Sequence, residues 1–136
     1  MAHIPDGYVL DAWSVMAYLE GEPAGAEVRS LIAAANISGA PLLMSVVNAA
    51  EVWYTIARES NAARADQGLA ELRQVGIRFW PADMEMALAA ARFKAAHRMS
   101  LADCFAAALA EAQQVALVTG DPEFSQVERA VKIVWL

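Results

Sequence analysis

The chain has 136 residues, of which 58% are hydrophobic, and its formal net charge is -6. This length suits a single domain over residues 1–136 with a substantial core, and the acidic balance excludes nucleic-acid binding through an extended basic surface. The single cysteine, Cys104, excludes an internal disulfide and a thiolate zinc site.

Short apolar runs alternate with helical patterns along the whole chain. The expected strands, bounded by turn residues, cover 7–10, 42–44, 77–80, 115–118 and 131–135. The expected helices cover 12–20 and 24–35, then run from Ser45 to about Arg58, from Asn61 to Gly76, from Asp83 to about His97, from Ser100 onward and briefly from Asp121. This alternation predicts an α/β fold, with a parallel sheet of about five strands between helices.

Four acidic residues occupy positions where a parallel sheet forms sites. Asp11 and Asp121 follow the first and fourth expected strands, whose carboxyl ends would border one crevice if the strands are neighbours. Glu51 and Asp103 lie on helices between apolar residues, and such carboxylates are rarely buried unless they are paired or bind a metal. Because crowded carboxylates repel one another, the pattern indicates a divalent cation among them.

Each acid also has an ordinary structural interpretation. Asp11 and Asp121 each precede a helix and would serve as its N-cap, and Asp103 lies three residues after a serine, as in a capping box. Glu51 would pair with an arginine such as Arg58. Capping and pairing explain each acid taken alone, whereas convergence of all four on one sheet edge is harder to explain in that way.

Four segments, taken together and in order, resemble the motifs of PIN-domain ribonucleases, and most closely those of the VapC-type toxins of toxin–antitoxin systems. The segments are residues 8–11, 45–52, 101–103 and 118–124. The resemblance covers nearly the whole chain. It implies a PIN-like three-layer α/β/α fold and an endoribonuclease that cleaves RNA phosphodiester bonds with metal-activated water.

The resemblance assigns both catalysis and metal binding to the four acids, Asp11, Glu51, Asp103 and Asp121. Glu123 matches a position where the family often has a further acid, and its longer side chain would reach the metal through water. Carboxylate oxygens select hard cations, so Mg²⁺ or Mn²⁺ is the expected cofactor.

Three polar residues are candidates for supporting these acids or for touching a phosphate: Asn48, Thr119 and Ser14. The family often has a serine or threonine two residues after the first acid. This chain has Trp13 at that place, and Ser14 comes next. The departure leaves open how a hydroxyl would reach the site.

The resemblance also implies partners: an RNA substrate, a cognate antitoxin that docks in a groove and blocks the site, and a second copy in a homodimer. We expect a cytoplasmic protein, because no signal peptide is evident and no apolar stretch approaches the ~20 residues that span a bilayer. The alternative is a PIN-like protein-interaction module with a degenerate, non-catalytic acidic site. A receiver-like phosphoacceptor is disfavoured, because Lys132 begins the last expected strand instead of ending a late one.

Overall fold

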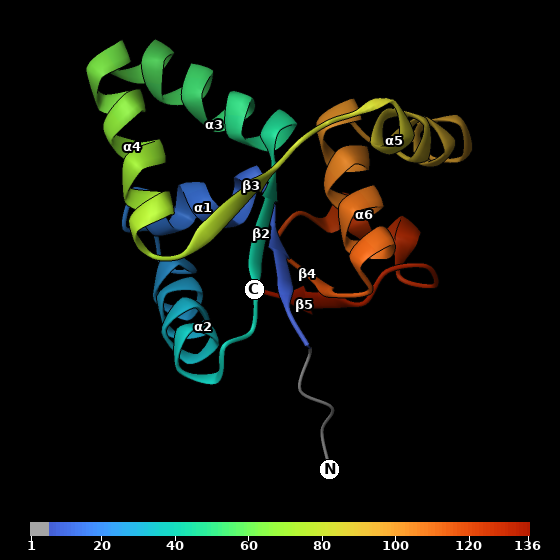
Figure 1. The fold of residues 1–136 in the computed structure, drawn as a ribbon. Helices are drawn as coiled ribbons and strands as arrows, with labels where there is room; N and C mark the ends of the chain where they lie inside the picture. Colours follow the sequence, from blue (N-terminus) through green and yellow to red (C-terminus); the bar gives the residue numbers. More distant parts are fainter. Residues whose placement is uncertain (1–5) are drawn as a thin grey trace.

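Five parallel strands form the centre of the molecule, in the spatial order β3-β2-β1-β4-β5 (Figure 1). The computed structural model describes residues 6–136. The strands are β1 (Tyr8–Leu10), β2 (Leu42–Ser45), β3 (Ile77–Trp80), β4 (Ala116–Thr119) and β5 (Ile133–Trp135). The expected parallel sheet is confirmed, although β4 ends one residue later than expected, at Thr119, and β5 begins later, at Ile133.

The direction of strand addition reverses between β1 and β4. The chain passes from β1 outward through β2 to β3, and then returns to place β4 on the other side of β1, with β5 beyond it. Leu10 is paired with Val118 in the register of these two strands, so their carboxyl ends coincide. In open α/β sheets, a ligand crevice forms outside the strand ends at such a reversal.

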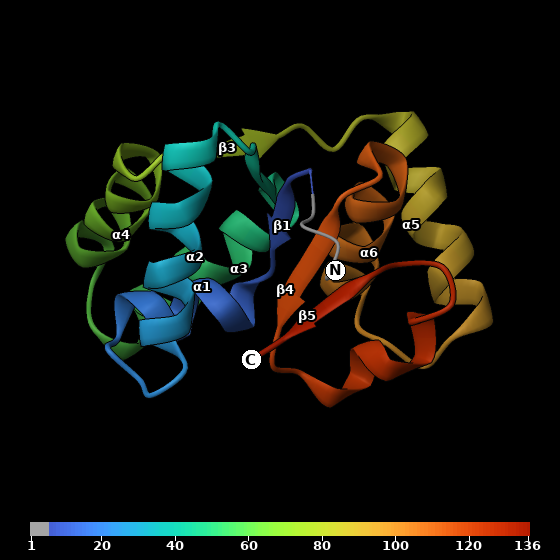
Figure 2. The same cartoon turned by 90° about the horizontal axis from the view of Figure 1, so that it is seen from below.

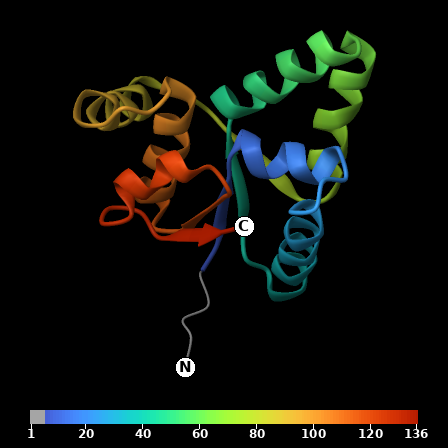
Figure 3. The same ribbon diagram turned by 180° about the vertical axis from the view of Figure 1, so that it is seen from behind.

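Helices cover both faces of the sheet (Figures 2 and 3). They are α1 (Ala12–Leu19), α2 (Gly25–Ser38), α3 (Val46–Glu59), α4 (Ala62–Gln74), α5 (Met84–Ala96), α6 (Leu101–Gln113) and the 3-10 helix η1 (Pro122–Val127). The first four pack on one face, and α5, α6 and η1 pack on the other. No helix within residues 6–136 has the length and apolar character needed to cross a membrane.

Each central strand contributes side chains to both layers, because successive residues of a strand point to opposite faces. Val9 and Leu43 pack into the core beneath α5 and α6. Leu10, Leu42 and Met44 pack into the core beneath α1 to α4. Burial on both faces accounts for the short, nearly continuous apolar runs from which the strands were expected.

Helix α6 is buried along most of its length. All seven residues from Cys104 to Ala110 are buried, and four of them are alanine. Small side chains let this helix approach both the sheet and α5 closely. The helix begins at Ser100, whose hydroxyl oxygen accepts a hydrogen bond from the Asp103 N–H at 3.1 Å. The first turn of α6, including Asp103, is therefore tied to a buried, immobile element.

Glycine determines where α2 begins and ends. The expected helix at 24–35 continues to Ser38 and stops at Gly39, which has a φ of 80° and thus the left-handed conformation that ends many helices. At the other end, a Cβ on Gly25 would lie 2.4 Å from the backbone carbonyl oxygen of Ala17 in α1. The two helices touch there through backbone atoms.

Replacing Gly25 should therefore destabilise the fold. Gly25→Ala forces α1 and α2 apart, because a backbone carbonyl cannot rotate away as a side chain can, and we expect a loss of ~1–3 kcal/mol in the free energy of unfolding. Urea denaturation measures this loss. The control Ala34→Ser, on the exposed side of α2, should change the value by no more than ~0.5 kcal/mol. Equal stability of Gly25→Ala and the wild type would contradict the close helix contact.

Candidate active site

The carboxyl ends of β1 and β4 are joined by a side-chain hydrogen bond. The hydroxyl of Thr119, the last residue of β4, donates to Oδ2 of Asp11 at 2.6 Å. Asp11 directly follows β1, and β1 and β4 are neighbours in the sheet, which is the condition under which the two strand-end acids border one crevice. Asp11 and Thr119 are 108 positions apart along the chain, so this bond depends on the strand order.

Asp11 is buried, with 1% of its surface exposed, and both of its carboxylate oxygens are occupied. Its Oδ1 accepts the N–H of Ser14 at 2.9 Å, which makes Asp11 the N-cap of α1. The Ser14 hydroxyl donates to the Asp11 carbonyl at 3.0 Å. The Asp121 N–H in turn donates to the Thr119 hydroxyl oxygen at 3.0 Å. Since the Ser14 and Thr119 hydroxyls are both buried in this network, supporting Asp11 suits them better than touching a phosphate.

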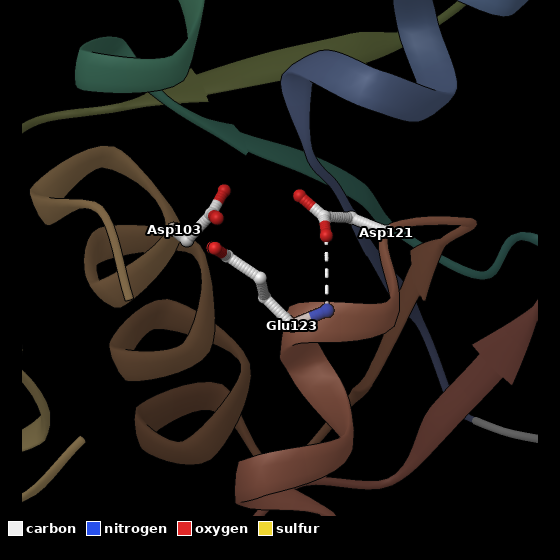
Figure 4. Close-up of side chains that lie close together, drawn as sticks. All are labelled: Asp103, Asp121 and Glu123. Carbon is white, nitrogen blue, oxygen red and sulfur yellow. Dashed lines mark hydrogen bonds between the residues drawn. The ribbon is translucent and has the colours of Figure 1, made fainter. Parts of the chain in front are cut away.

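Three other carboxylates come together beside this network (Figure 4). Asp103, Asp121 and Glu123 each offer one oxygen, and these three atoms lie within 4.8 Å of one another. Asp103 comes from the first turn of α6, whereas Asp121 and Glu123 come from the start of η1. The Glu123 N–H donates to Oδ1 of Asp121 at 2.9 Å, so Asp121 also caps η1. Capping and convergence are thus compatible, and we call these three residues the acidic cluster.

The acidic cluster lines an open pocket of about 750 Å³. Glu51 of α3 lines the same pocket, as do Trp13 of α1 and the unexpected Glu22. Glu22 lies in the turn between α1 and α2, where the sequence carries no signal beyond a helix break. Of the four acids expected to converge, Asp103, Asp121 and Glu51 face this pocket, and Asp11 lies buried next to it.

The pairing of Glu51 with Arg58 is wrong. Within residues 6–136, the recorded ion pair is Arg64 with Glu71, at 3.6 Å. The guanidinium of Arg58 instead lies over the ring of Tyr54, 5.0 Å from its centroid. Among the described residues, Glu51 therefore has no recorded cationic partner and stays in the pocket.

The pKa values of Asp11, Glu51 and Asp103 are raised. Burial, followed by the charges of Asp121 and Asp11, raises the pKa of Asp103 to about 7. Burial raises the pKa of Asp11 to about 6, against the opposing effect of its hydrogen bonds from Thr119 and Ser14. Burial and the charge of Asp121 raise the pKa of Glu51 as well. Each shift means that negative charge at this place costs free energy in the protein alone.

The donor set fits a hard divalent cation. All the ligand atoms that the acidic cluster offers are carboxylate oxygens, which Mg²⁺ and Mn²⁺ prefer. No lysine or arginine is among the described residues that line the pocket, so its negative charge is not compensated there. Burial first, and then the negative charges of neighbouring acids, raise the pKa values of Asp103 and Glu51, and a bound cation would offset both effects.

Asn48 links α3 to the start of α6 beside the site. It is fully buried on α3, and its Nδ2 donates to the carbonyl oxygen of Ala102 at 3.0 Å. Its Oδ1 has no hydrogen-bond partner among the described residues. The bond to Ala102 ties α3 to the first turn of α6, immediately before Asp103. Asn48 therefore helps to set the position of Asp103.

Comparison with known proteins gives a consistent family and fold. The family model of the PIN domain matches residues 8–130. A search of the curated proteins found no matching sequence. Among solved structures, DNA-bound VapBC from Salmonella typhimurium superposes with a TM-score of 0.75 at 15% identity, over 94% of this chain and 96% of that one.

Two structures from Mycobacterium tuberculosis are also similar. VapC20, a toxin that cleaves the sarcin–ricin loop, has a TM-score of 0.69 at 16% identity, over 89% of this chain and 95% of that one. VapBC-5, a member of the VapBC toxin–antitoxin family, has a TM-score of 0.63 at 21% identity, over 97% of this chain and 100% of that one. At these identities the likeness concerns the fold.

Replacing Asp103 should stabilise the metal-free protein at high pH. The pKa of Asp103 is about 7 in the folded state, against 3.8 for the unperturbed group, so the folded protein binds more protons than the unfolded chain between these values. The contribution of Asp103 to stability therefore falls as the pH rises from about 4 to about 7. Asp103→Asn removes this penalty, and its melting temperature in EDTA should exceed that of the wild type at pH 8, by a margin that shrinks toward pH 4.

Glu128→Gln is the control for this measurement, because Glu128 is exposed and lies outside the pocket. We expect the melting curves of this variant to follow those of the wild type at every pH. A difference between Asp103→Asn and the wild type that does not change with pH would show that Asp103 carries no titration penalty.

Proposed function

This chain belongs to the PIN-domain family, and from that premise we propose that it is a Mg²⁺- or Mn²⁺-dependent endoribonuclease, the toxin of a VapBC-type pair. The observation that carries the proposal is the acidic cluster, where three carboxylate oxygens lie within 4.8 Å of one another and no described residue that lines the pocket is a lysine or an arginine. Such a cluster is tolerable when it binds a cation. RNA, as a polyanion, would enter a pocket of this charge with the help of that cation.

The acidic residues of the pocket would have different roles in binding a metal ion. Asp103, Asp121 and Glu123 would hold the ion, and Glu51 would complete the negative wall of the pocket from α3. When bound, a divalent cation supplies a Lewis acid that activates water and stabilises the charge that develops on the phosphodiester.

Asp11 has a different environment. Metal binding by Asp11 would use an oxygen that already accepts a hydrogen bond, from Ser14 or from Thr119. Its burial favours a supporting role, in which it fixes the start of α1 and, through Thr119, the backbone at Asp121. Its negative charge next to the acidic cluster also favours a cation there.

RNA cleavage tests the proposal. The wild-type protein should cut RNA with Mg²⁺ or Mn²⁺ and not in EDTA. Asp103→Asn and Asp121→Asn should each lower the cleavage rate by on the order of 100-fold or more, because each removes a charged ligand where even supporting residues are worth ~10–100-fold. Gel-based cleavage assays measure the rates, with Glu128→Gln as a control that should cleave at the wild-type rate.

Calorimetry with Mn²⁺ separates the two remaining interpretations. Binding of Mn²⁺ that is lost in Asp103→Asn supports the nuclease. A folded wild-type protein that binds no Mn²⁺ and cuts no RNA would favour the alternative, a PIN-like interaction module with a degenerate acidic site.

We further propose that a cognate antitoxin covers an apolar groove on the α1–α4 side of the molecule. The groove has a volume of about 530 Å³ and is lined by Val46, Ala49, Ala50, Trp53, Tyr54, Leu69, Arg73 and Phe79. Tyr54 is 44% exposed, an unusual state for an aromatic ring beside other apolar residues. Structures of similar fold include a toxin–antitoxin complex from Klebsiella pneumoniae.

The charges at this groove indicate what kind of segment fits it. Arg58 lies over Tyr54, and Arg73 lies over Phe79 at 5.1 Å from the ring centroid. These two cations at the groove of an acidic protein favour an amphipathic segment with apolar anchors and acidic side chains.

The expected homodimer stays a prediction, and the exposed Met84 and Leu88 of α5 are apolar side chains that such a contact would cover. A cytoplasmic location, where RNA and antitoxin meet the protein, also belongs to the proposal.

Substitution in the groove should separate partner binding from catalysis. Leu69→Arg places a charge among apolar groove residues, and we expect it to weaken binding of the protein encoded by the neighbouring reading frame by at least about tenfold, measured by calorimetry. RNA cleavage by the free protein should not change, since Leu69 lies outside the acidic pocket. Ile37→Arg, at a residue that is 89% exposed on α2, is the control and should bind normally. Unchanged binding by Leu69→Arg would place the partner elsewhere.

A further inference from the structure

Trp13 brings an aromatic ring into the acidic pocket. It lies in the first turn of α1, two residues after Asp11, and it lines the pocket together with Asp121 and Glu123. The ring is 40% exposed, although a large apolar side chain gains most from being buried. Metal binding does not explain a tryptophan at this place, because an indole offers no oxygen ligand to a hard cation.

The backbone of Gly120 holds the indole in position. A Cβ on Gly120 would lie 2.2 Å from Cη2 of Trp13, 2.4 Å from Cζ3 and 2.6 Å from Cζ2. An approach in the plane of the ring would leave Cζ2 and Cζ3 much farther away than Cη2, so Gly120 lies against a face of the six-membered ring. One face of the indole thus rests on the backbone directly before Asp121, and only glycine leaves room for this contact.

Among its described lining residues, the pocket offers few other groups that could hold a nucleotide. None of its described lining residues is a lysine or an arginine, so compensation of a phosphate's charge there depends on the cation, and Thr55 and Ser100 add only neutral hydroxyls. The apolar part of the lining is Trp13 with its neighbours Ala12, Met16 and Pro122. A cation contacts the phosphate and leaves the base unheld. An aromatic ring beside the carboxylates supplies the missing contact, because every nucleobase presents a flat face to stack on it.

We propose that Trp13 is a stacking platform for a nucleobase of the RNA, next to the phosphodiester held at Asp103, Asp121 and Glu123. This inference rests on the proposed function and adds to it how a base of the substrate is bound. Gly120 presents the ring at a fixed height beside Asp121, so that the base and its phosphate are bound as one unit. Binding of this kind does not depend on which base is present, since stacking uses the face of a base and not its edge.

A structural role for Trp13 predicts different behaviour. In that case the indole would only shield Gly120 and the buried Asp11 network, and its loss would weaken every ligand of the pocket alike. A stacking platform instead affects ligands that carry a base and spares those that do not. The ratio of two affinities, one with the base and one without, therefore distinguishes the two roles.

The experiment compares adenosine monophosphate with ribose 5-phosphate as ligands of the Mg²⁺-loaded protein. Both carry the same phosphate, and only the first carries a base. Stacking should make the wild-type protein bind adenosine monophosphate on the order of tenfold more tightly, with quenching of tryptophan emission. In Trp13→Ala the two dissociation constants should become nearly equal, through loss of affinity for adenosine monophosphate alone.

Three further variants keep this test independent of folding defects. Trp13→Met fills similar space without a ring and should lose the preference, whereas Trp13→Phe should keep part of it. Trp135→Ala removes a tryptophan of nearly equal exposure, 41%, that does not line the pocket, and should behave as the wild type.

The outcomes that overturn the inference are distinct from failure of the nuclease function. Equal binding of the two ligands by the wild-type protein, or a preference that Trp13→Ala and Trp13→Met leave intact, overturns the stacking role and leaves the metal–phosphate site standing. Failure of both ligands to bind the Mg²⁺-loaded protein overturns the stacking role and the nuclease function together.

Discussion

The hydrogen bond between Thr119 and Asp11 is the constraint on which the site depends. It joins the carboxyl ends of β1 and β4, the two strands between which the direction of strand addition reverses. Thr119 also accepts the Asp121 N–H, and Asp11 also caps α1, so one buried network sets the start of α1 and the approach to η1. Together with the pairing of β1 and β4 and the contact of Trp13 with Gly120, this network positions Asp121 and Trp13 relative to each other.

Burial and the closeness of other acids make negative charge unfavourable at Asp103. The carboxylate of Asp11, which is 1% exposed, still acts on Asp103 through space, and burial of Asp103 itself adds the larger effect. Keeping these acids together thus lowers the free energy of unfolding of the protein, as is common at functional sites. Asn48 contributes from the other side, because its bond to the Ala102 carbonyl keeps the first turn of α6 against α3. Hydrogen bonds to the backbone and to neighbouring residues therefore hold the acids in place. Among the described contacts, none joins the side chains of the three clustered carboxylates to one another.

Much of the architecture could be predicted from the sequence, because the alternation of short apolar runs and helical patterns has few solutions. The runs ending at Leu10 and Val118 both proved to be buried parallel strands, and the acids that follow them proved to be close. The element boundaries were less certain. Thr119 was expected just beyond its strand and instead ends it, which is what places its hydroxyl opposite Asp11.

The exact membership of the site could not be predicted from spacing. A carboxylate at a strand end can face the crevice or lie beneath it. The buried position of Asp11 depends on hydrogen bonds from the nearby Ser14 N–H and from the Thr119 hydroxyl, 108 residues away. Glu123 entered the acidic cluster because η1 winds tightly after Asp121, and Glu22 entered the pocket from a turn. The contact of Trp13 with Gly120 had no signal in the sequence, since it joins two segments only through the fold.

The acidic cluster joins two elements with very different freedom to vary. Asp103 stands at the start of a helix whose residues from Cys104 to Ala110 are all buried, so changes in that stretch of α6 disturb the core. Glu123 stands on an exposed turn of η1, where only Phe124 and Val127 are buried. Substitutions at a few surface positions of η1 can therefore change the length and charge of the side chain at position 123. Asp103 on the buried helix α6 keeps its position when they occur.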